Sequence, residues 1–247
     1  MIIETIEDGF LNYRFPLVEG FDYGFNLYAL IAGKNVMLFD SAFRSQVKEV
    51  KSDLDSRGLK ITHVIATHFH NDHIAGLMAL DEDVMVLGSS DFEKTLSKKL
   101  PQQVTPVSFN ETMKFGDFFL SFTASPGHSA CSIVTEINNK YLHVGDNLMS
   151  RYDGKAILPW VQYNFLERHI DSLKNIRNRE KSVILQSHGP AIIGEQNIKN
   201  AIDNRLSYLE IVFGSEGNCT YQEAIKDCTC EFVGTEFFDF LISKQTL

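Results

Sequence analysis

The sequence predicts an α/β protein in which two packed sheets are covered by helices on their outer faces. Strand-like segments are grouped in both halves of the chain, and segments with apolar residues three or four apart, typical of amphipathic helices, separate and follow them. Such sheets and helices bury their apolar faces against one another in layers. With 247 residues, of which 44% are hydrophobic, the chain is long enough to bury a sizeable core.

The expected elements follow from these apolar patterns. Strands of the first half are predicted at 2–6, 10–17, 25–32, 35–40, 61–67 and 84–88. Strands of the second half are predicted at 104–108, 118–124, 130–137, 140–145 and 182–186. Helices are predicted at 46–57, 72–80, 91–100, 166–178 and 196–212, and the tail from about residue 195 is expected to be largely helical.

Four metal-ligating side chains lie within six residues, directly after the strand-like run 61–66. They are His68, His70, Asp72 and His73. If the extended chain persists through His70, its period of two places His68 and His70 on one side, and a helix beginning near Asp72 returns the other two toward the same space. Imidazole and carboxylate groups suit zinc and related first-row ions. The sequence therefore predicts a metal centre in a strand-to-helix turn.

Four ligands in one turn do not complete two metal sites, so the remaining ligands must come from elsewhere. His128, Asp146 and His188 each stand where a predicted strand runs into a turn of small residues. Five of the eight histidines then belong to this pattern. The other three are expected to pack or to face solvent, with the last of them on a surface helix: His63, His143 and His169.

The order His-x-His-x-Asp-His, followed by His, Asp and His, resembles the ligand pattern of the dinuclear members of the metallo-β-lactamase superfamily. The segments 26–31 and 37–42 are similar to the opening strands of that family and the acidic turn that ends them. The resemblance implies a four-layer αββα sandwich. It also implies that His68, His70 and His128 hold one metal, that Asp72, His73 and His188 hold a second, and that Asp146 bridges the two.

The C-terminal region extends the resemblance. The segments 205–211 and 217–220 are similar to the helical extension of glyoxalase-II-like hydrolases, and Thr220 with Glu223 fits a capping box. We therefore expect residues 1–194 to form the catalytic domain and residues 195–247 to form a helical extension packed on it. The resemblance implies two divalent ions, zinc in the first place, with iron or manganese as alternatives.

The implied chemistry is hydrolysis of a small ester, thioester or lactone. Two ions roughly 3.5 to 4 Å apart share a water, lower its pKa and ready a bridging hydroxide for attack on a carbonyl or phosphoryl centre. By the geometry of the family, Asp72 is the nearest carboxylate and orients the hydroxide or accepts its proton. Asp40 is expected to accept a hydrogen bond from the second ring nitrogen of a ligand histidine.

Other functions stay open at this stage. The same fold would also suit an iron-dependent oxidoreductase of the sulfur dioxygenase type or a phosphodiesterase. His70 stands where flavodiiron oxidoreductases carry a glutamate, which favours hydrolytic metals over redox iron. A metal-stabilised binding protein without turnover is a further alternative, and the complete ligand set argues against it. Metal analysis with aerobic and anaerobic assays separates hydrolysis from oxygen-dependent chemistry.

The segment 147–165, which follows Asp146, is expected to select the substrate. Its candidate contacts are Arg151, Tyr152, Lys155, Trp160 and Tyr163. The Cys-Gly-His with its following tyrosine segment, which glyoxalase II uses for a glutathione thioester, is missing from the sequence. This departure argues against glutathione specificity and leaves the substrate class of the hydrolase open.

Composition restricts the partners and the surroundings. A net charge of -9 argues against a general nucleic-acid surface, which needs clustered Lys and Arg. The four cysteines do not resemble a disulfide framework, so thiols are expected. No apolar run approaches the roughly 18 residues that cross a bilayer, and the first residues lack the pattern of a signal peptide. We expect a cytoplasmic enzyme for a small-molecule substrate, without a membrane partner and with homo-oligomers left open.

Overall fold

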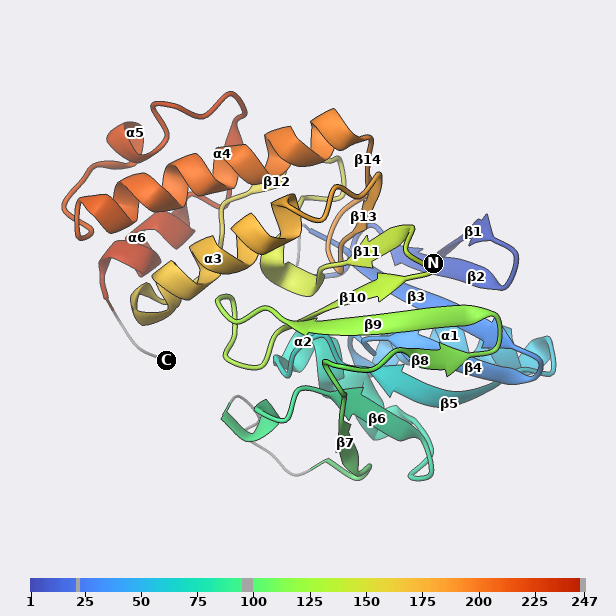
Figure 1. Cartoon of the computed structure of the whole chain (residues 1–247). Helices are drawn as coiled ribbons and strands as arrows, with labels where there is room; N and C mark the ends of the chain where they lie inside the picture. Colours follow the sequence, from blue (N-terminus) through green and yellow to red (C-terminus); the bar gives the residue numbers. More distant parts are fainter. Residues whose placement is uncertain (21–22, 95–99, 245–247) are drawn as a thin grey trace.

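The computed structural model describes residues 1–20, 23–94 and 100–244, which form two β-sheets packed face to face (Figure 1). The first sheet runs in the order β1 to β7. The first four strands pair antiparallel and the last four pair in parallel, so β4 belongs to both patterns. The strands are β1 (Ile2–Glu7), β2 (Phe10–Phe15), β3 (Phe25–Ala32), β4 (Asn35–Phe39), β5 (Lys60–Ile65), β6 (Met85–Gly88) and β7 (Val104–Pro106).

The second sheet has the order β14-β13-β11-β10-β9-β8. Its strands pair antiparallel except for the parallel pair β11 and β13. They are β8 (Met113–Phe115), β9 (Phe118–Ala124), β10 (Ile133–Ile137), β11 (Tyr141–His143), β13 (Val183–Leu185) and β14 (Ile192–Ile193). A separate short pair joins β12 (Ala156–Ile157) to β15 (Phe232–Val233) in parallel.

Helices cover the outer faces of both sheets (Figure 1). The α-helices are α1 (Arg44–Ser56), α2 (Asn71–Ile74), α3 (Leu166–Arg177), α4 (Glu195–Gly214), α5 (Tyr221–Ala224) and α6 (Glu236–Ile242). Four 3₁₀ turns complete the described elements: η1 (Ala75–Ala79), η2 (Phe92–Lys94), η3 (Gly145–Asn147) and η4 (Tyr163–Phe165).

Three hydrophobic clusters hold these layers together. In α1, Val47, Val50 and Leu54 recur three and four residues apart, so one face of the helix packs on the first sheet. A second cluster lies between the sheets, where Phe10 and Phe39 of the first meet residues such as Leu120 of the second. The third cluster packs α3 to α6 on the outer face of the second sheet. The predicted four-layer αββα arrangement is therefore confirmed.

Two predicted elements differ from the structure. The segment expected as a strand of the second half at 104–108 is β7, at the edge of the first sheet. Chain order alone does not show which sheet an edge strand joins. The helix expected at 72–80 is instead α2 followed by η1, because its backbone bonds to the turn after β4: Ser41 N donates to His73 O at 2.7 Å and Gly76 N to Ala42 O at 2.8 Å.

Smaller differences concern His169 and the shortest elements. His169 was predicted on a surface helix, yet it is 1% exposed, because the backbone of Gly127 packs closely against it. Of the helix expected at 91–100, the structure has the turn η2, and residues 95–99 lie outside the described residues. The strands β8, β12, β14 and β15 are only two or three residues long and were not predicted, because so short a run carries no periodicity.

The tail after residue 194 packs on the outer face of the second sheet. Its helices share the third cluster with Leu142 and Val144, and the capping box predicted at Thr220 and Glu223 is confirmed. None of the four cysteines, all in the described part, is in a disulfide, and Cys131 is buried in the core. Among the described residues, no helix is both long and apolar enough to cross a membrane.

Candidate metal centre

The seven predicted ligands converge where strands of both sheets end. His68 and His70 follow β5, and Asp72 and His73 lie on α2. From the second sheet come three more: His128 from the turn between β9 and β10, Asp146 from η3 after β11, and His188 after β13. Their ligand atoms form two groups, His68 with His70 and His128, and Asp72 with His73, Asp146 and His188, each within 4.8 Å.

The first group is a set of three imidazoles. His70 Nδ1 lies 3.0 Å from His68 Nε2 and 3.0 Å from His128 Nε2. Burial lowers the pKa of all three histidines, that of His128 to about 3. The rings are therefore neutral at physiological pH, and each has one nitrogen lone pair for a cation.

The second group combines two histidines with two carboxylates. His73 Nε2 lies 3.3 Å from His188 Nε2, and Asp72 Oδ2 lies 3.6 Å from His188 Nε2. Burial lowers the pKa of His188, but Asp146 and Asp72 outweigh burial and raise that pKa to about 9. For His73 the carboxylates likewise outweigh burial and hold its pKa well above the ordinary value. This group attracts positive charge, whether as protons or as a metal ion.

Asp146 lies between the two groups. Its Oδ2 is 3.2 Å from His73 Nε2 and 3.5 Å from His128 Nε2, so one carboxylate oxygen approaches a histidine of each group. Burial raises the pKa of Asp146, but His188 and His73 outweigh burial and keep the pKa well below its usual range. The Oδ1 atom is buried and accepts no hydrogen bond from the described residues. A cation would satisfy this oxygen, so the donor set fits divalent metal ions.

Hydrogen bonds fix the orientation of the histidine rings from behind. His188 Nδ1 donates to Gly24 O at 2.7 Å, and His128 Nδ1 donates to Trp160 O at 2.9 Å. The Asp40 carboxylate lies 2.8 Å from His73 Nδ1, which confirms the acceptor role predicted for it. Each bond directs Nε2 and its lone pair toward the centre, as the ligands of a metal require.

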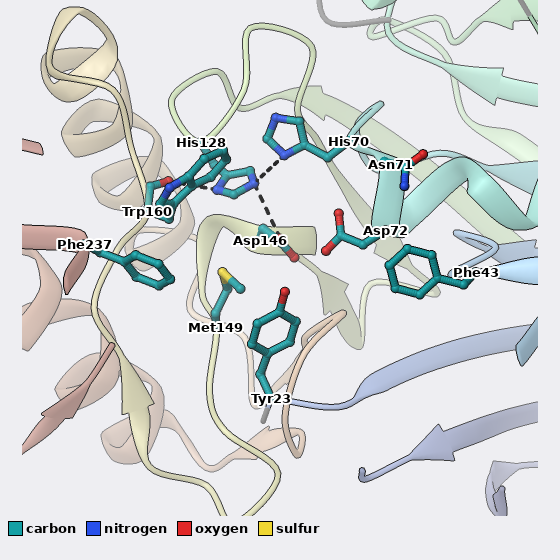
Figure 2. A pocket seen from close by; sticks show the side chains of 10 residues that line it. All are labelled: Tyr23, Phe43, His70, Asn71, Asp72, His128, Asp146, Met149, Trp160 and Phe237. Carbon is teal, nitrogen blue, oxygen red and sulfur yellow. Dashed lines mark hydrogen bonds and ion pairs between the residues drawn. The ribbon is translucent and has the colours of Figure 1, made fainter. Parts of the chain in front are cut away.

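The centre opens into a cavity of about 400 Å³. Figure 2 shows Trp160 and Phe237 on one side and Phe43 on the other, with the carboxylates of Asp72 and Asp146 between them. The described lining residues are Tyr23, Phe43, His70, Asn71, Asp72, His128, Asp146, Met149, Trp160 and Phe237.

Only part of the predicted substrate segment reaches this cavity. Trp160 lines it as expected, and Met149 of the same segment does so without having been predicted. The other candidates do not line it: Arg151 pairs with Asp153, Lys155 lines a different cavity, and Tyr152 and Tyr163 are likewise absent from the described lining. Four further lining residues were not predicted, because none of them belongs to the His and Asp pattern that revealed the site: Tyr23, Phe43, Asn71 and Phe237.

The fold is a two-sheet sandwich. Where strands of both sheets end, it carries two adjacent groups of donors, one of three histidines and one of two histidines and two aspartates. A model of the metallo-beta-lactamase superfamily matches residues 24–188. The chain therefore belongs to the metallo-beta-lactamase superfamily, as the ligand pattern predicted.

Individual relatives are distant. An atrochrysone carboxyl ACP thioesterase of Paecilomyces divaricatus is 25% identical over 190 residues, 74% of this chain and 55% of that protein. A metal-dependent hydrolase of Rhizobium etli is 25% identical over 135 residues, 54% of this chain and 57% of that protein. The chain thus spans about half the length of these relatives. A solved metallo-beta-lactamase from Pontibacter korlensis shares the fold, with a TM-score of 0.71, 18% identity and coverage of 85% of this chain and 98% of that one.

Proposed function

We propose that this chain is a metal-dependent hydrolase with a dinuclear centre. One divalent ion would be held by His68, His70 and His128, a second by Asp72, His73 and His188, and both by Asp146. Zinc is the first expectation, with iron or manganese as alternatives. The observation that carries the proposal is the convergence of these donors around Asp146, whose buried Oδ1 accepts no hydrogen bond from any described residue. The centre would lie within a catalytic domain at 1–194, with 195–247 as its helical extension.

Two bound cations would supply a water of lowered pKa and positive charge for the oxyanion that develops during hydrolysis. Asp72 would orient this water for attack, because its carboxylate points into the cavity beside the histidines (Figure 2). Burial raises the pKa of Asp72, but His73 and His188 outweigh burial and lower the pKa to about 2. Asp72 is therefore ionised at neutral pH, so its oxygens could accept a hydrogen bond from the water and orient it.

The substrate class that we propose is a small ester, thioester or lactone. The thioesterase name belongs to the relative in Paecilomyces divaricatus, and it places thioesters first among the classes to test. In thioester hydrolysis, the water oxygen bonds to the acyl carbon and the C–S bond breaks. The products are a carboxylic acid and a thiol, whose sulfur takes one of the water protons.

The test is an assay of the purified protein loaded with zinc, manganese or iron against a panel of thioesters, esters, lactones and phosphodiesters. We expect turnover that a strong chelator abolishes, that re-added metal restores and that is equal with and without oxygen. Turnover only of phosphodiesters, or turnover that requires oxygen, would replace the proposed reaction. No turnover of any substrate by protein with two bound metals would favour a binding protein.

A further inference from the structure

We propose that Trp160 and the C-terminal helix α6 form a wall that selects substrates with an uncharged, flat apolar acyl group. The proposal rests on the hydrolase function above and names the substrate class of the same site. Five of the described lining residues are apolar or aromatic and surround the predicted ligands: Tyr23, Phe43, Met149, Trp160 and Phe237. Flat, apolar surfaces of this kind bind aromatic groups by excluding water and by ring contacts.

The wall is built by pairing the loop after the metal centre with the C-terminal tail. Ile157 of β12 pairs with Val233 of β15, and the next amide, Leu158 N, donates to Val233 O at 2.9 Å. This pairing brings Trp160, two residues further along, beside the start of α6. The tail lies outside residues 24–188, which match the superfamily model. Of the two parts of the wall, α6 therefore lies outside the segment that the superfamily model matches, and Trp160 lies within it.

Two residues of α6 have different roles in the wall. The ring of Phe240 stacks on Trp160, with centroids 5.6 Å apart and planes at 19°, and supports the indole from one side. Phe237 faces the cavity itself (Figure 2). The ring of Phe237 packs over Gly234, where a methyl group would lie 3.1 Å from it and where φ is +73°. A glycine at this position lets the ring lie close to the backbone.

The wall adjoins the reacting centre. The Trp160 ring centroid is 5.2 Å from that of His70 and 5.2 Å from that of His128. The carbonyl oxygen of Trp160 also accepts the hydrogen bond from His128 Nδ1. An acyl group packed against Trp160 and Phe237 would therefore hold its carbonyl carbon beside the proposed metal ligands.

The described lining offers no cationic side chain to an anionic group on the acyl chain. Among the described residues of this cavity there is no Lys or Arg, and the lining carboxylates and imidazoles belong to the proposed metal ligands. The two basic side chains of the segment 147–165 lie outside this cavity. Arg151 pairs with Asp153, and Lys155 lines a different cavity. A carboxylate on the acyl chain would lose its hydration against the wall and gain no cationic side chain in return.

The experiment compares three N-acetylcysteamine thioesters with the metal-loaded enzyme: acetyl, phenylacetyl and succinyl. We expect kcat/KM for phenylacetyl to exceed that for succinyl by about tenfold or more. Phe237→Ala should lower kcat/KM for phenylacetyl by about tenfold, mainly through KM, and that for acetyl by no more than about twofold. Phe237→Leu, which keeps an apolar side chain but removes the ring, should fall between Phe237→Ala and the wild type.

Phe213→Ala is the matched control, because Phe213 is 43% exposed near the end of α4 and lies outside the cavity. Phe213→Ala should leave kcat/KM for all three thioesters unchanged. A higher kcat/KM for the succinyl than for the phenylacetyl thioester would overturn the proposed wall. So would Phe237 variants in which kcat/KM for the acetyl and phenylacetyl thioesters changes equally or not at all.

A binding measurement separates this proposal from the hydrolase proposal. Trp160 is the sole tryptophan, so its fluorescence reports ligands at the wall. N-ethylphenylacetamide, an uncharged analogue, should shift the emission of both metal-loaded and chelated protein at lower concentration than N-ethylsuccinamate. If no thioester, ester or lactone is hydrolysed, the hydrolase proposal fails. The fluorescence titration then tests the wall independently of turnover. Equal or tighter binding of the succinamate by the chelated protein would then refute the wall.

Discussion

Asp40 holds His73 in place through a bond of 2.8 Å between its Oδ2 and His73 Nδ1. The same carboxylate accepts the hydroxyl hydrogen of Thr67, whose oxygen lies 3.1 Å from His68 Nδ1 and can accept its hydrogen. Ser187 Oγ, in the turn that follows β13 of the second sheet, donates to Asp40 Oδ2 at 2.9 Å. One carboxylate behind the centre therefore orients a histidine of each ligand group and ties the two sheets together.

Asp40→Asn should weaken metal binding without removing a ligand. The amide has one acceptor oxygen, whereas the carboxylate accepts from the Thr67 backbone N–H through Oδ1 and from His73 through Oδ2, and the amide no longer offsets the positive charge of the cations. We expect metal affinity to fall by about 10- to 100-fold. Metal-competition titration with a chromophoric chelator measures it. Asp83→Asn removes an exposed carboxylate paired with Lys60 and is the matched control. Equal affinities in wild type and Asp40→Asn would argue against the positioning role.

Metal content should be close to two ions per chain in protein expressed with ample zinc, manganese and iron. The reason is the two groups of donors, with Asp146 Oδ2 of the second group 3.5 Å from His128 Nε2 of the first. Elemental analysis of gel-filtered protein gives the stoichiometry, and the same samples after dialysis against a strong chelator should be inactive. A content near zero under these conditions would remove the basis of the dinuclear proposal.

Asp146→Asn should cause the preferential loss of one metal and a steep fall in turnover. The change is nearly isosteric, but it removes a negative charge that offsets the mutual repulsion of two dications. The fold should persist, because the backbone amide and carbonyl groups around η3 are unaffected, and circular dichroism would verify this. Retention of two metals with wild-type turnover would show that Asp146 is not shared between the ions.

Trp160→Ala and His70→Ala should separate substrate binding from chemistry. Loss of the indole removes a cavity wall but leaves the backbone carbonyl that accepts from His128, so metal content should stay unchanged while KM rises. Loss of His70 removes a proposed ligand, so metal content and turnover should fall for every substrate. Steady-state kinetics with elemental analysis on both variants distinguishes the roles. If Trp160→Ala leaves all kinetic constants untouched, its contact with substrate must be abandoned.

Stability should depend on pH through His143. The ring is fully buried, stacks on Phe39 at 4.9 Å, and neither nitrogen has a hydrogen-bond partner among the described residues. Burial lowers the pKa of His143 from 6.5 to about 4. Between these values the unfolded chain binds the proton and the folded chain does not, so this contribution to stability is present above pH 6.5 and is lost as pH falls toward 4.

His143→Leu removes this proton linkage and the unsatisfied nitrogens. Relative to wild type, the variant should gain about 2 kcal/mol more in the free energy of unfolding at pH 5 than at pH 7.5. Denaturant unfolding of both proteins at the two pH values measures this difference, and contributions from groups that they share cancel. A difference that is independent of pH would mean that the pKa of His143 is the same in the folded and the unfolded chain.

The convergence of the seven ligand-type side chains could be predicted from the sequence, because histidine and aspartate are recognisable as metal-ligating residue types. Four ligand-type side chains within six residues are unusual, and in the structure they meet His128, Asp146 and His188. The wall was not predictable in this way. Phe237 looks like any core residue in the sequence, and its place near Trp160 depends on the pairing of β12 with β15, each only two residues long. The same reason explains β7, whose sheet is decided by packing rather than by its own three residues.

The origin of the ligands has a mechanical consequence. His68, His70, Asp72 and His73 follow strand β5 of the first sheet, and His128, Asp146 and His188 follow strands β9, β11 and β13 of the second. Sliding of one sheet over the other would change distances in both ligand groups at once. Bound ions would therefore cross-link the two sheets. Metal loading should then raise the free energy needed to separate the two sheets. The affinity for metal would in turn depend on how closely the sheets pack.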